Sequence, residues 1–510
     1  MPEGPAAPAE VRAEGFGWRH AGRRRPAVSG LDLHIRAGEK VLLLGASGAG
    51  KSTLLHALAG ILADDEGDGG GEQAGRLSIE GADPRRARGR AGLVLQDPES
   101  QVVLSRVGDE VAFGAENLRV PAAQIPARTA QALEDVGLGH LPPGHPTAAL
   151  SGGQKQRLAL AAVLAMQPGL LLLDEPTANL DPAGVLEVRD AVARTVERTG
   201  ATLIVVEHRT AVWAPVVDRV LVLAADGGLL ADGPPEQVLG GQGIRSRLAA
   251  AGVWVPGLDP LAADGGPPLP APGTPGDTLL TAEDLAVAPS RHAQPVLAGV
   301  DLQLRAGTML GVVGPNGAGK STLALALGGL TAPRAGSLRA EPALRGTLGA
   351  EPRRWKPPQL IPRIGSVFQE PEHQFLTGRV RDELAYGPRR IRRERSAVVE
   401  ELAERLRLGH LMDVNPFTLS GGEKRRLSVA TVLAAAPQVL LLDEPTFGQD
   451  ARTWAQLVRL LAEQAAGGRA VVAVTHDADF LAALDAARLQ VGGGAAAAER
   501  PADALRGAGA

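Results

Sequence analysis

Four short motifs occur twice along the chain at nearly constant separation, and this repeat limits the possible folds more than any other feature. The first half contains GASGAGKST at 45–53, LSGGQ at 150–154, LLLLDEP at 170–176 and a histidine after VVE. The second half contains GPNGAGKST at 314–322, LSGGE at 419–423, VLLLDEP at 439–445 and a histidine after AVT. Lys51 and Lys320 are 269 residues apart, as are Asp174 and Asp443, so one domain has been duplicated.

The length and charge of the chain agree with this interpretation. A chain of 510 residues exceeds the roughly 250–300 residues at which single hydrophobic cores stop growing. With 53 Lys and Arg against 57 Asp and Glu, the net charge of −4 gives no global reason to bind nucleic acid. The absence of cysteine excludes disulfides and Cys-ligated zinc. The start of the chain does not resemble a secretory signal and no apolar run approaches a membrane span, so we expect a cytoplasmic protein whose membrane contacts come through a partner.

Each half alternates short leucine- and valine-rich runs with longer helical stretches. VLLLG is followed by KSTLLHALAGIL, and LLLLD is followed by PAGVLEVRDAVARTVERT and TLIVVEH. Strands that are apolar on both faces and alternate with helices are typical of a parallel α/β sheet. We predict such a sheet in each half, and a helical subdomain over about 100–149, which contains no strand-like run.

A Pro- and Gly-rich segment separates the two copies. The predicted order is a first domain at 10–247, a linker at 248–278, a second domain at 279–495 and a flexible tail at 496–510. Two further segments, 63–75 and 332–359, are low in sequence complexity. We expect them to be surface insertions.

A Gly-rich motif of the form GxxxxGK[ST] follows a predicted strand and opens a predicted helix in each half. The glycines let the backbone curl, so that successive N–H groups and the helix N-terminus face phosphate oxygens. The lysine can then reach the β- and γ-phosphates of ATP, and the adjacent serine can bind Mg²⁺. An isolated Gly-rich turn is the alternative, but two matches in register make it improbable. The predicted residues are Gly45, Ser47, Gly48, Gly50, Lys51, Ser52 and Thr53, and Gly314, Asn316, Gly317, Gly319, Lys320, Ser321 and Thr322.

An acidic pair ends an apolar strand in each copy. Asp174 and Asp443 stand at the strand end, where a buried aspartate can hold Mg²⁺. Glu175 and Glu444 follow directly, and a carboxylate beside the γ-phosphate can orient and activate the attacking water. A solvated acidic pair is the alternative reading, but it does not explain why a proline follows both pairs.

The sequence LSGG opens a predicted helix in each copy and offers a second anion-binding helix N-terminus. The residues are Ser151, Gly152 and Gly153 in the first copy and Ser420, Gly421 and Gly422 in the second. On these motifs the chain resembles the ATP-binding-cassette (ABC) family over nearly all of both halves. The resemblance implies two P-loop NTPase (RecA-like) domains, each with a helical subdomain and an N-terminal antiparallel β region. It also implies that the domains face head to tail, with each ATP sandwiched between one P-loop and the opposite LSGG.

Two further pairs of residues match motifs of this family. His208 and His476 match the switch histidine that contacts the γ-phosphate, although a lone histidine is more often a packing residue. Gln96 and Gln369 match the glutamine that contacts Mg²⁺ or water and links to the helical subdomain.

The two copies also differ from each other. Trp18 stands at the family's adenine-stacking position, whereas the second copy has Val287, which offers no π-face. The loop after the catalytic glutamate is ANLD, ending at Asp181, in the first copy and FGQD, ending at Asp450, in the second. We therefore expect two functional but unequal ATP sites.

The sequences that follow Gln96 and Gln369 indicate which group within the ABC family the chain resembles. LQDPESQ precedes VGDEVAFGAENL in the first copy, and FQEPEHQ precedes VRDELAYGPRRI in the second. Both resemble the ATPases of energy-coupling-factor (ECF) importers for vitamins and metals. The resemblance implies that 97–101 and 370–374 shape a groove for a coupling helix of a transmembrane subunit; ordinary helix capping is the alternative. The segment PTFGQD of the second copy resembles the corresponding segment of fused ATPases for hydroxymethylpyrimidine or thiamine uptake. Cobalt, nickel and other vitamins stay open as alternative transported substrates.

The leading hypothesis is the ATP-hydrolysing subunit of an ECF-type importer on the cytoplasmic face of the membrane. Its ligands are ATP and Mg²⁺, and its partners are a transmembrane coupling subunit and a membrane substrate-binding subunit. A soluble tandem ABC protein acting on ribosomes or nucleic acid is disfavoured because the linker has few cations. The fused ATPase of a sugar importer and a non-catalytic scaffold are disfavoured because both lysines and both catalytic glutamates are present.

Overall fold

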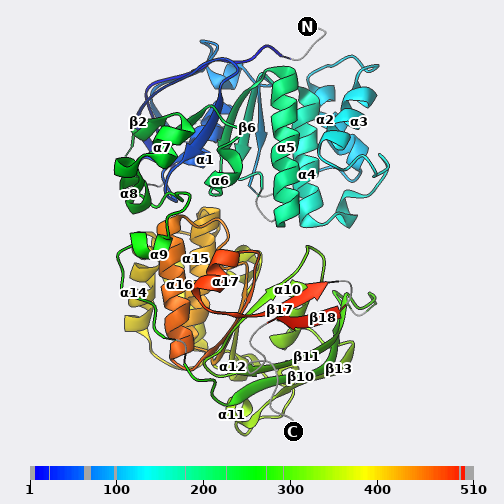
Figure 1. Ribbon diagram of the computed structural model, residues 1–510, viewed down its shortest axis with the longest axis vertical. Helices are drawn as coiled ribbons and strands as arrows, with labels where there is room; N and C mark the ends of the chain where they lie inside the picture. Colours follow the sequence, from blue (N-terminus) through cyan, green and yellow to red (C-terminus); the bar gives the residue numbers. More distant parts are fainter. Residues whose placement is uncertain are drawn as a thin grey trace. The chain divides into compact units, whose positions relative to one another are not determined.

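The chain folds into two compact units (Figure 1). The computed structural model describes residues 6–499 except 22, 24, 63–70, 97–99, 178–179, 226, 272, 291 and 493–494. The first unit comprises residues 1–265 with 450–452, and the second comprises 266–449 with 453–510. No helix in the described part of the chain is both long and apolar enough to cross a membrane.

A six-stranded sheet forms the centre of each unit, with the same strand order in both. In the first unit the order is β5 (Ala91–Val94), β6 (Leu170–Asp174), β7 (Thr202–Val206), β3 (Lys40–Leu44), β8 (Arg219–Leu223) and β9 (Leu229–Gly233). In the second it is β14 (Ile364–Val367), β15 (Val439–Asp443), β16 (Ala470–Val474), β12 (Met309–Val313), β17 (Ala487–Gly492) and β18 (Ala495–Glu499). The strands are parallel except for the edge strands β9 and β18. Every residue of β6 and β15 is buried, as expected of strands covered on both faces.

A three-stranded antiparallel sheet accompanies each central sheet. The strand orders are β2 (Val28–Ile35), β1 (Val11–Arg19) and β4 (Glu72–Ile79), and β11 (Leu297–Arg305), β10 (Thr278–Val287) and β13 (Ala335–Ala340). The predicted fold class is confirmed, including this antiparallel region. The prediction of surface insertions was wrong where these segments form strands: β4 includes 72–75 of the segment 63–75, and β13 lies inside 332–359. Residues 63–70 lie outside the described part of the chain.

Helices cover the sheets and form the predicted helical subdomains. In the first unit they are α1 (Lys51–Leu58), α2 (Val107–Asn117), α3 (Ile125–Asp135), α4 (Gly152–Met166), α5 (Pro182–Thr199), α6 (Thr210–Trp213), α7 (Pro235–Gly240), α8 (Gln242–Ala250) and α9 (Pro260–Ala263). Further along the chain they are α10 (Lys320–Leu327), α11 (Pro342–Arg345), α12 (Pro357–Leu360), α13 (Val380–Arg390), α14 (Ser396–Arg405), α15 (Gly421–Ala435), α16 (Ala451–Ala466) and α17 (Ala478–Ala483). In Figure 1, α2 and α3 lie beside α4, which they contact, and α13 and α14 contact α15 in the same way.

The segment expected to be a linker begins inside the first unit. Leu248 ends up in the first hydrophobic core, as do Val253 and Val255, and all three are buried. Helix α8 continues to Ala250 and the helical turn α9 follows. The first core therefore extends past residue 247, because the apolar side chains between the prolines and glycines of this segment pack against it.

Candidate functional site

Each Gly-rich loop connects a buried strand to a helix that begins at the lysine. The loop after β3 precedes α1, and the loop after β12 precedes α10. In the first loop, φ is +82° at Gly48 and +87° at Gly50, a region that disfavours side chains. A Cβ at Gly50 would lie 2.2 Å from the carbonyl oxygen of Ala27, and one at Gly314 would lie 2.0 Å from that of Val491. Glycine is therefore required at these turns.

The two lysines fold back over their own loops. Lys51 Nζ donates to the carbonyl oxygens of Gly45 and Ala46 at 2.8 and 3.0 Å, and Lys320 does the same to Gly314 and Pro315. Both lysines are only 7% exposed. Burial lowers the pKa of Lys51, against the opposing effect of Glu175. A buried ammonium group beside loop N–H groups suits the triphosphate of a nucleotide.

The serine after each lysine meets the aspartate at the end of the neighbouring strand. The Ser52 hydroxyl hydrogen-bonds to Asp174, and that of Ser321 to Asp443. Burial, followed by repulsion from Glu175, raises the pKa of Asp174 to about 6, and burial raises the pKa of Asp443. A hydroxyl and a buried carboxylate are oxygen ligands of the kind Mg²⁺ takes beside phosphates, and a cation would offset the cost of burying the charge. The residues present therefore fit MgATP.

The glutamate after each of these aspartates has an unusual backbone conformation. Glu175 has φ of +48° and Glu444 has φ of +47°. Their N–H groups donate to Val206 O at 2.9 Å and Val474 O at 2.8 Å on the adjacent strands. Left-handed backbone at a non-glycine residue is costly and is found mainly where a site needs it. Nothing in the sequence indicated this turn.

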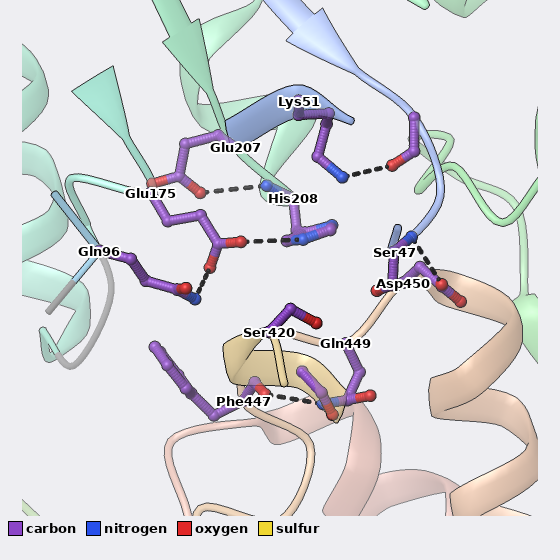
Figure 2. A network of polar contacts seen from close by, with 12 residues as sticks. Ser47, Lys51, Gln96, Glu175, Glu207, His208, Ser420, Phe447, Gln449 and Asp450 are labelled. Carbon is purple, nitrogen blue, oxygen red and sulfur yellow. Dashed lines mark hydrogen bonds and ion pairs between the residues drawn. The ribbon is translucent and has the colours of Figure 1, made fainter. Parts of the chain in front are cut away.

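Glu175 is held by two polar side chains from neighbouring strands (Figure 2). Gln96 Nε2 donates to one carboxylate oxygen at 2.8 Å, and His208 Nε2 lies 3.2 Å from the other. Burial alone would raise the pKa of Glu175, but His208, Lys51 and Gln96 together outweigh burial and leave the pKa below its usual range. The first unit thus brings Gln96, Glu175 and His208 together, as the motifs predicted.

Glu444 has different partners. The Thr475 hydroxyl donates to it at 3.0 Å. His476 Nε2 lies instead 3.2 Å from Lys320 Nζ and 3.1 Å from Asn316 Oδ1. Burial, followed by repulsion from Asp443, raises the pKa of Glu444 to about 7. The equivalent glutamates and histidines of the two units therefore have different neighbours.

Comparison with known proteins accounts for the repeat. A family model described as ABC transporter matches residues 28–178 and again 297–447. The chain belongs to the ABC transporter family. It is a tandem ABC ATPase, with two domains that bind ATP with Mg²⁺.

Individual relatives cover most of this tandem ABC ATPase. A Bacillus subtilis protein, provisionally named HMP/thiamine import ATP-binding protein YkoD, is 36% identical over 90% of this chain and 85% of its own length. The Streptomyces coelicolor ABC transporter ATP-binding protein SCO2324, also provisionally named, is 34% identical over 93% of this chain and 91% of its own. The solved structure entitled "Model of ribosome-bound archaeal Pelota and ABCE1" has a TM-score of 0.63 at 20% identity and covers 95% of this chain and 78% of that one, a likeness of fold alone.

A threonine two residues after Glu175 and after Glu444 is anchored by a carboxylate in both halves of the tandem ABC ATPase, but the carboxylates come from different positions. Thr177 donates its N–H to Glu207 Oε1 at 3.1 Å and its hydroxyl to the same oxygen. The other oxygen of Glu207 accepts the N–H of His208 at 3.2 Å (Figure 2). In the second half, Thr446 donates its hydroxyl to Asp477 at 2.8 Å. The anchoring carboxylate thus precedes the histidine in one half and follows it in the other.

A buried arginine distinguishes the second half of the tandem ABC ATPase. Arg425, on α15, is 5% exposed and donates to the carbonyl oxygens of Phe368 at 2.8 Å and Asp443 at 3.2 Å, and to that of Gln369. The equivalent residue on α4 is Gln156, which is 1% exposed; among the described residues, neither polar atom of its side chain has a hydrogen-bond partner. Arg425 therefore ties the glutamine loop of the second half to the end of β15. Comparing the residues two positions after LSGGQ and LSGGE would have revealed the difference but not its consequence.

The two LSGG motifs form the N-termini of α4 and α15. The Ser151 hydroxyl accepts the N–H of Gln154 at 3.3 Å, and the Gln154 side chain accepts the N–H of Ser151 at 2.9 Å. Ser420 and Glu423 form the same reciprocal cap. The caps leave the adjacent glycine N–H groups at the helix start, where they can face an anion.

The predicted adenine-stacking residue is enclosed in this structure. Trp18 is 3% exposed and Val287 is 1% exposed. A Cβ at Gly71 would lie 2.4 Å from the indole, and His20 packs edge-on at a centroid distance of 6.3 Å. Stacking of adenine on Trp18 would require these neighbours to move, so this role stays a prediction.

The second glutamine of each Q-loop motif holds its own loop. Gln101 accepts the N–H of Leu95 at 2.9 Å and donates to Leu93 O at 3.0 Å. Gln374 makes the same two bonds to Phe368 N and Ser366 O. Neither glutamine is a helix cap. Asp97, Pro98 and Glu99 lie outside the described residues, as do Ala178 and Asn179 of the ANLD loop.

Proposed function

We propose that this tandem ABC ATPase is the energy-coupling subunit of an ECF-type importer, bound to the cytoplasmic face of the membrane through a transmembrane subunit. The observation that carries the proposal is a pair of exposed apolar side chains at equivalent places in both helical subdomains. Val103 and Phe113 are 66% and 46% exposed, and Leu376 and Tyr386 are 66% and 38% exposed. We call these the apolar pairs.

A buried glutamate positions each apolar pair. Glu110 is 5% exposed and accepts the N–H groups of Val103 at 3.1 Å and Leu104 at 2.6 Å. Glu383 is 4% exposed and accepts the N–H groups of Leu376 at 3.0 Å and Thr377 at 2.8 Å. Each glutamate lies on the helix that carries the aromatic member of the pair. Its hydrogen bonds fix the loop that carries the aliphatic member.

Large apolar side chains that are exposed to solvent at two equivalent sites indicate docking surfaces for another protein. A short apolar helix of a transmembrane subunit fits them, because each surface directly follows the glutamine loop of its ATP site and could pass motion to it. The import function in the name of the Bacillus subtilis relative supports this occupant. Uptake of hydroxymethylpyrimidine or thiamine is accordingly the first transport reaction to test.

The ATPase cycle assigned to the site uses this chain's own residues. Loop N–H groups with Lys51 or Lys320 bind the phosphates, and bound Mg²⁺ would supply positive charge for the oxygens of the γ-phosphate. Glu175 or Glu444 accepts a proton from the attacking water, and the nearby histidine contacts the γ-phosphate. Gln96 and Gln369 connect each site to its helical subdomain.

Co-purification from membranes tests the proposal. The tagged chain should bring down transmembrane subunits, and Phe113→Ser with Tyr386→Ser should release them while the ATPase activity of the purified chain persists. Leu186→Ser with Leu330→Ser is the matched control, since these leucines are 47% and 46% exposed elsewhere on the two units. Recovery of ribosomes without any membrane protein would overturn the proposal in favour of a soluble tandem ATPase.

A further inference from the structure

One edge of the second helical subdomain is rich in arginine, whereas its counterpart in the first unit is not. Residues 379–395 contain seven arginines and three acidic residues, a net charge of +4. The equivalent residues 106–122 contain two arginines and three acidic residues, a net charge of −1. We call 379–395 the basic edge. The duplicated domains therefore carry opposite charges at the same place in the fold.

The arginines of the basic edge are mostly exposed and unpaired. Arg381 contacts Asp413 at 2.7 Å, and Arg389 contacts Asp382 at 3.3 Å. Among the residues that the structure describes, the other exposed arginines of the edge form no ion pair; they are Arg379, Arg390, Arg392 and Arg393. These four guanidinium groups are available to a polyanion.

The basic edge adjoins exposed apolar side chains. It comprises the residue before α13, all of α13 and the connection to α14. Arg389 and Arg390 follow Tyr386 by three and four residues, so they share its side of the helix. Leu376 precedes the edge by three residues and is also exposed. Arginines beside aromatic and aliphatic side chains on one helix are typical of surfaces that bind anionic membranes.

We propose that the basic edge binds anionic lipid headgroups. The tandem ABC ATPase is then held at the membrane by lipid at one helical subdomain, in addition to its subunit partner. The inference rests on the proposed function, because the edge meets lipid only where the helical subdomain faces a membrane. A nucleic acid would present phosphates too, but the compact edge and its apolar neighbours favour lipid, and the net charge of −4 gives no broad attraction to nucleic acid.

Vesicle flotation of the purified full-length chain tests this inference. We expect the chain to float with phosphatidylcholine vesicles that contain phosphatidylglycerol and to stay behind with phosphatidylcholine alone. Arg390→Gln with Arg392→Gln and Arg393→Gln should weaken binding roughly tenfold or more, because each arginine near an anionic surface contributes separately. The matched control is Arg339→Gln with Arg353→Gln and Arg354→Gln, which removes the same charge from exposed positions elsewhere in the second unit and should bind like the unmodified chain.

Several outcomes would overturn the inference. Equal losses in the two triple variants would indicate general charge attraction, and equal binding to both kinds of vesicle would exclude headgroup charge. If RNA at the same phosphate concentration displaced the chain from vesicles, and only the basic-edge variant lost RNA binding, the partner would be nucleic acid. The assay contains no membrane subunits, so absent flotation together with intact co-purification would refute this inference and leave the proposed function standing.

Discussion

Arg425 is the single residue whose removal should most clearly distinguish the two ATPase units. Its three backbone bonds are made inside the protein, where leaving carbonyl groups without donors is costly. We expect Arg425→Gln, which reproduces the residue of the first unit, to lower the free energy of unfolding of the second unit by about 2–3 kcal/mol. Calorimetric unfolding of the full chain measures this loss.

The control for Arg425 lies at the same place in the other unit. The buried polar atoms of Gln156 have no hydrogen-bond partner within the described part of the chain, so Gln156→Met should keep or slightly raise the stability of the first unit. If both variants changed the free energy of unfolding of their units by the same amount, the assigned role of Arg425 would be wrong.

Glu207 should make the stability of the first unit depend on pH. Its pKa is raised, first because the side chain is buried. The folded unit therefore binds this proton more tightly than the unfolded chain, so the contribution to stability is complete below the ordinary pKa of 4.5 and is lost as pH rises through the folded pKa. Glu207→Gln cannot ionise and should flatten the dependence of melting temperature on pH as pH rises above the ordinary pKa of 4.5.

An exposed glutamate provides the comparison for this experiment. Glu197 lies on α5 in the same unit and is exposed to solvent. A Glu197→Gln variant should retain the pH dependence of the unmodified chain. Identical profiles for the two variants would show that Glu207 is not the responsible group.

At the level of individual residues, the motifs indicated which side chains of the first unit meet, but neither how they are held nor that the second unit differs. Gln96, Glu175 and His208 come together as their register in the repeat indicated. The left-handed backbone of Glu175 was not predictable, because it is imposed by a bond to Val206 on another strand. Partner choice across the sheet, such as Thr475 for Glu444, likewise depends on packing that local sequence does not encode.

At the level of elements, the loop before α13 depends on Glu383. This carboxylate accepts two N–H groups and the Thr377 hydroxyl. We expect Glu383→Ala to loosen the loop, since the amides of Leu376 and Thr377 lose their acceptor, and to speed hydrogen exchange at these two residues roughly tenfold or more. Release of the transmembrane subunit should follow.

Glu383→Gln is the conservative partner of this change. The amide oxygen can still accept from the loop, so exchange rates and partner binding should stay closer to those of the unmodified chain. Unchanged exchange in the alanine variant would contradict the assignment of Glu383 as the residue that positions this apolar pair.

Elements with strong periodic patterns were predictable, and those fixed by pairing were not. The buried strands β6 and β15 read directly from their leucine runs. Strands β4 and β13 begin with polar and small residues that favour no strand by themselves. They form because β1 and β10 offer them antiparallel partners, which local composition cannot indicate.

At the level of the whole molecule, the two sites should contribute unequally to turnover. Glu175 is held by Gln96 and His208, whereas Glu444 accepts a hydrogen bond from Thr475. His476 of the second unit lies against Lys320 and Asn316. We expect Glu175→Gln to reduce ATP hydrolysis more than Glu444→Gln, with ATP binding retained in both, as measured by steady-state turnover and nucleotide titration. Equal losses of ATP hydrolysis in the two variants would mean that the structural difference between the sites does not affect turnover.

The anchoring of Thr177 by Glu207 and of Thr446 by Asp477 restricts how these two halves can evolve. Each half needs one carboxylate for its threonine, but the two carboxylates occupy positions on opposite sides of the histidine. Converting one arrangement to the other a single codon at a time passes through a form with two carboxylates or none at this contact. Epistasis of this kind keeps the halves from converging by point mutation and predicts that gene conversion between them succeeds only when the segment around the histidine is exchanged as a block.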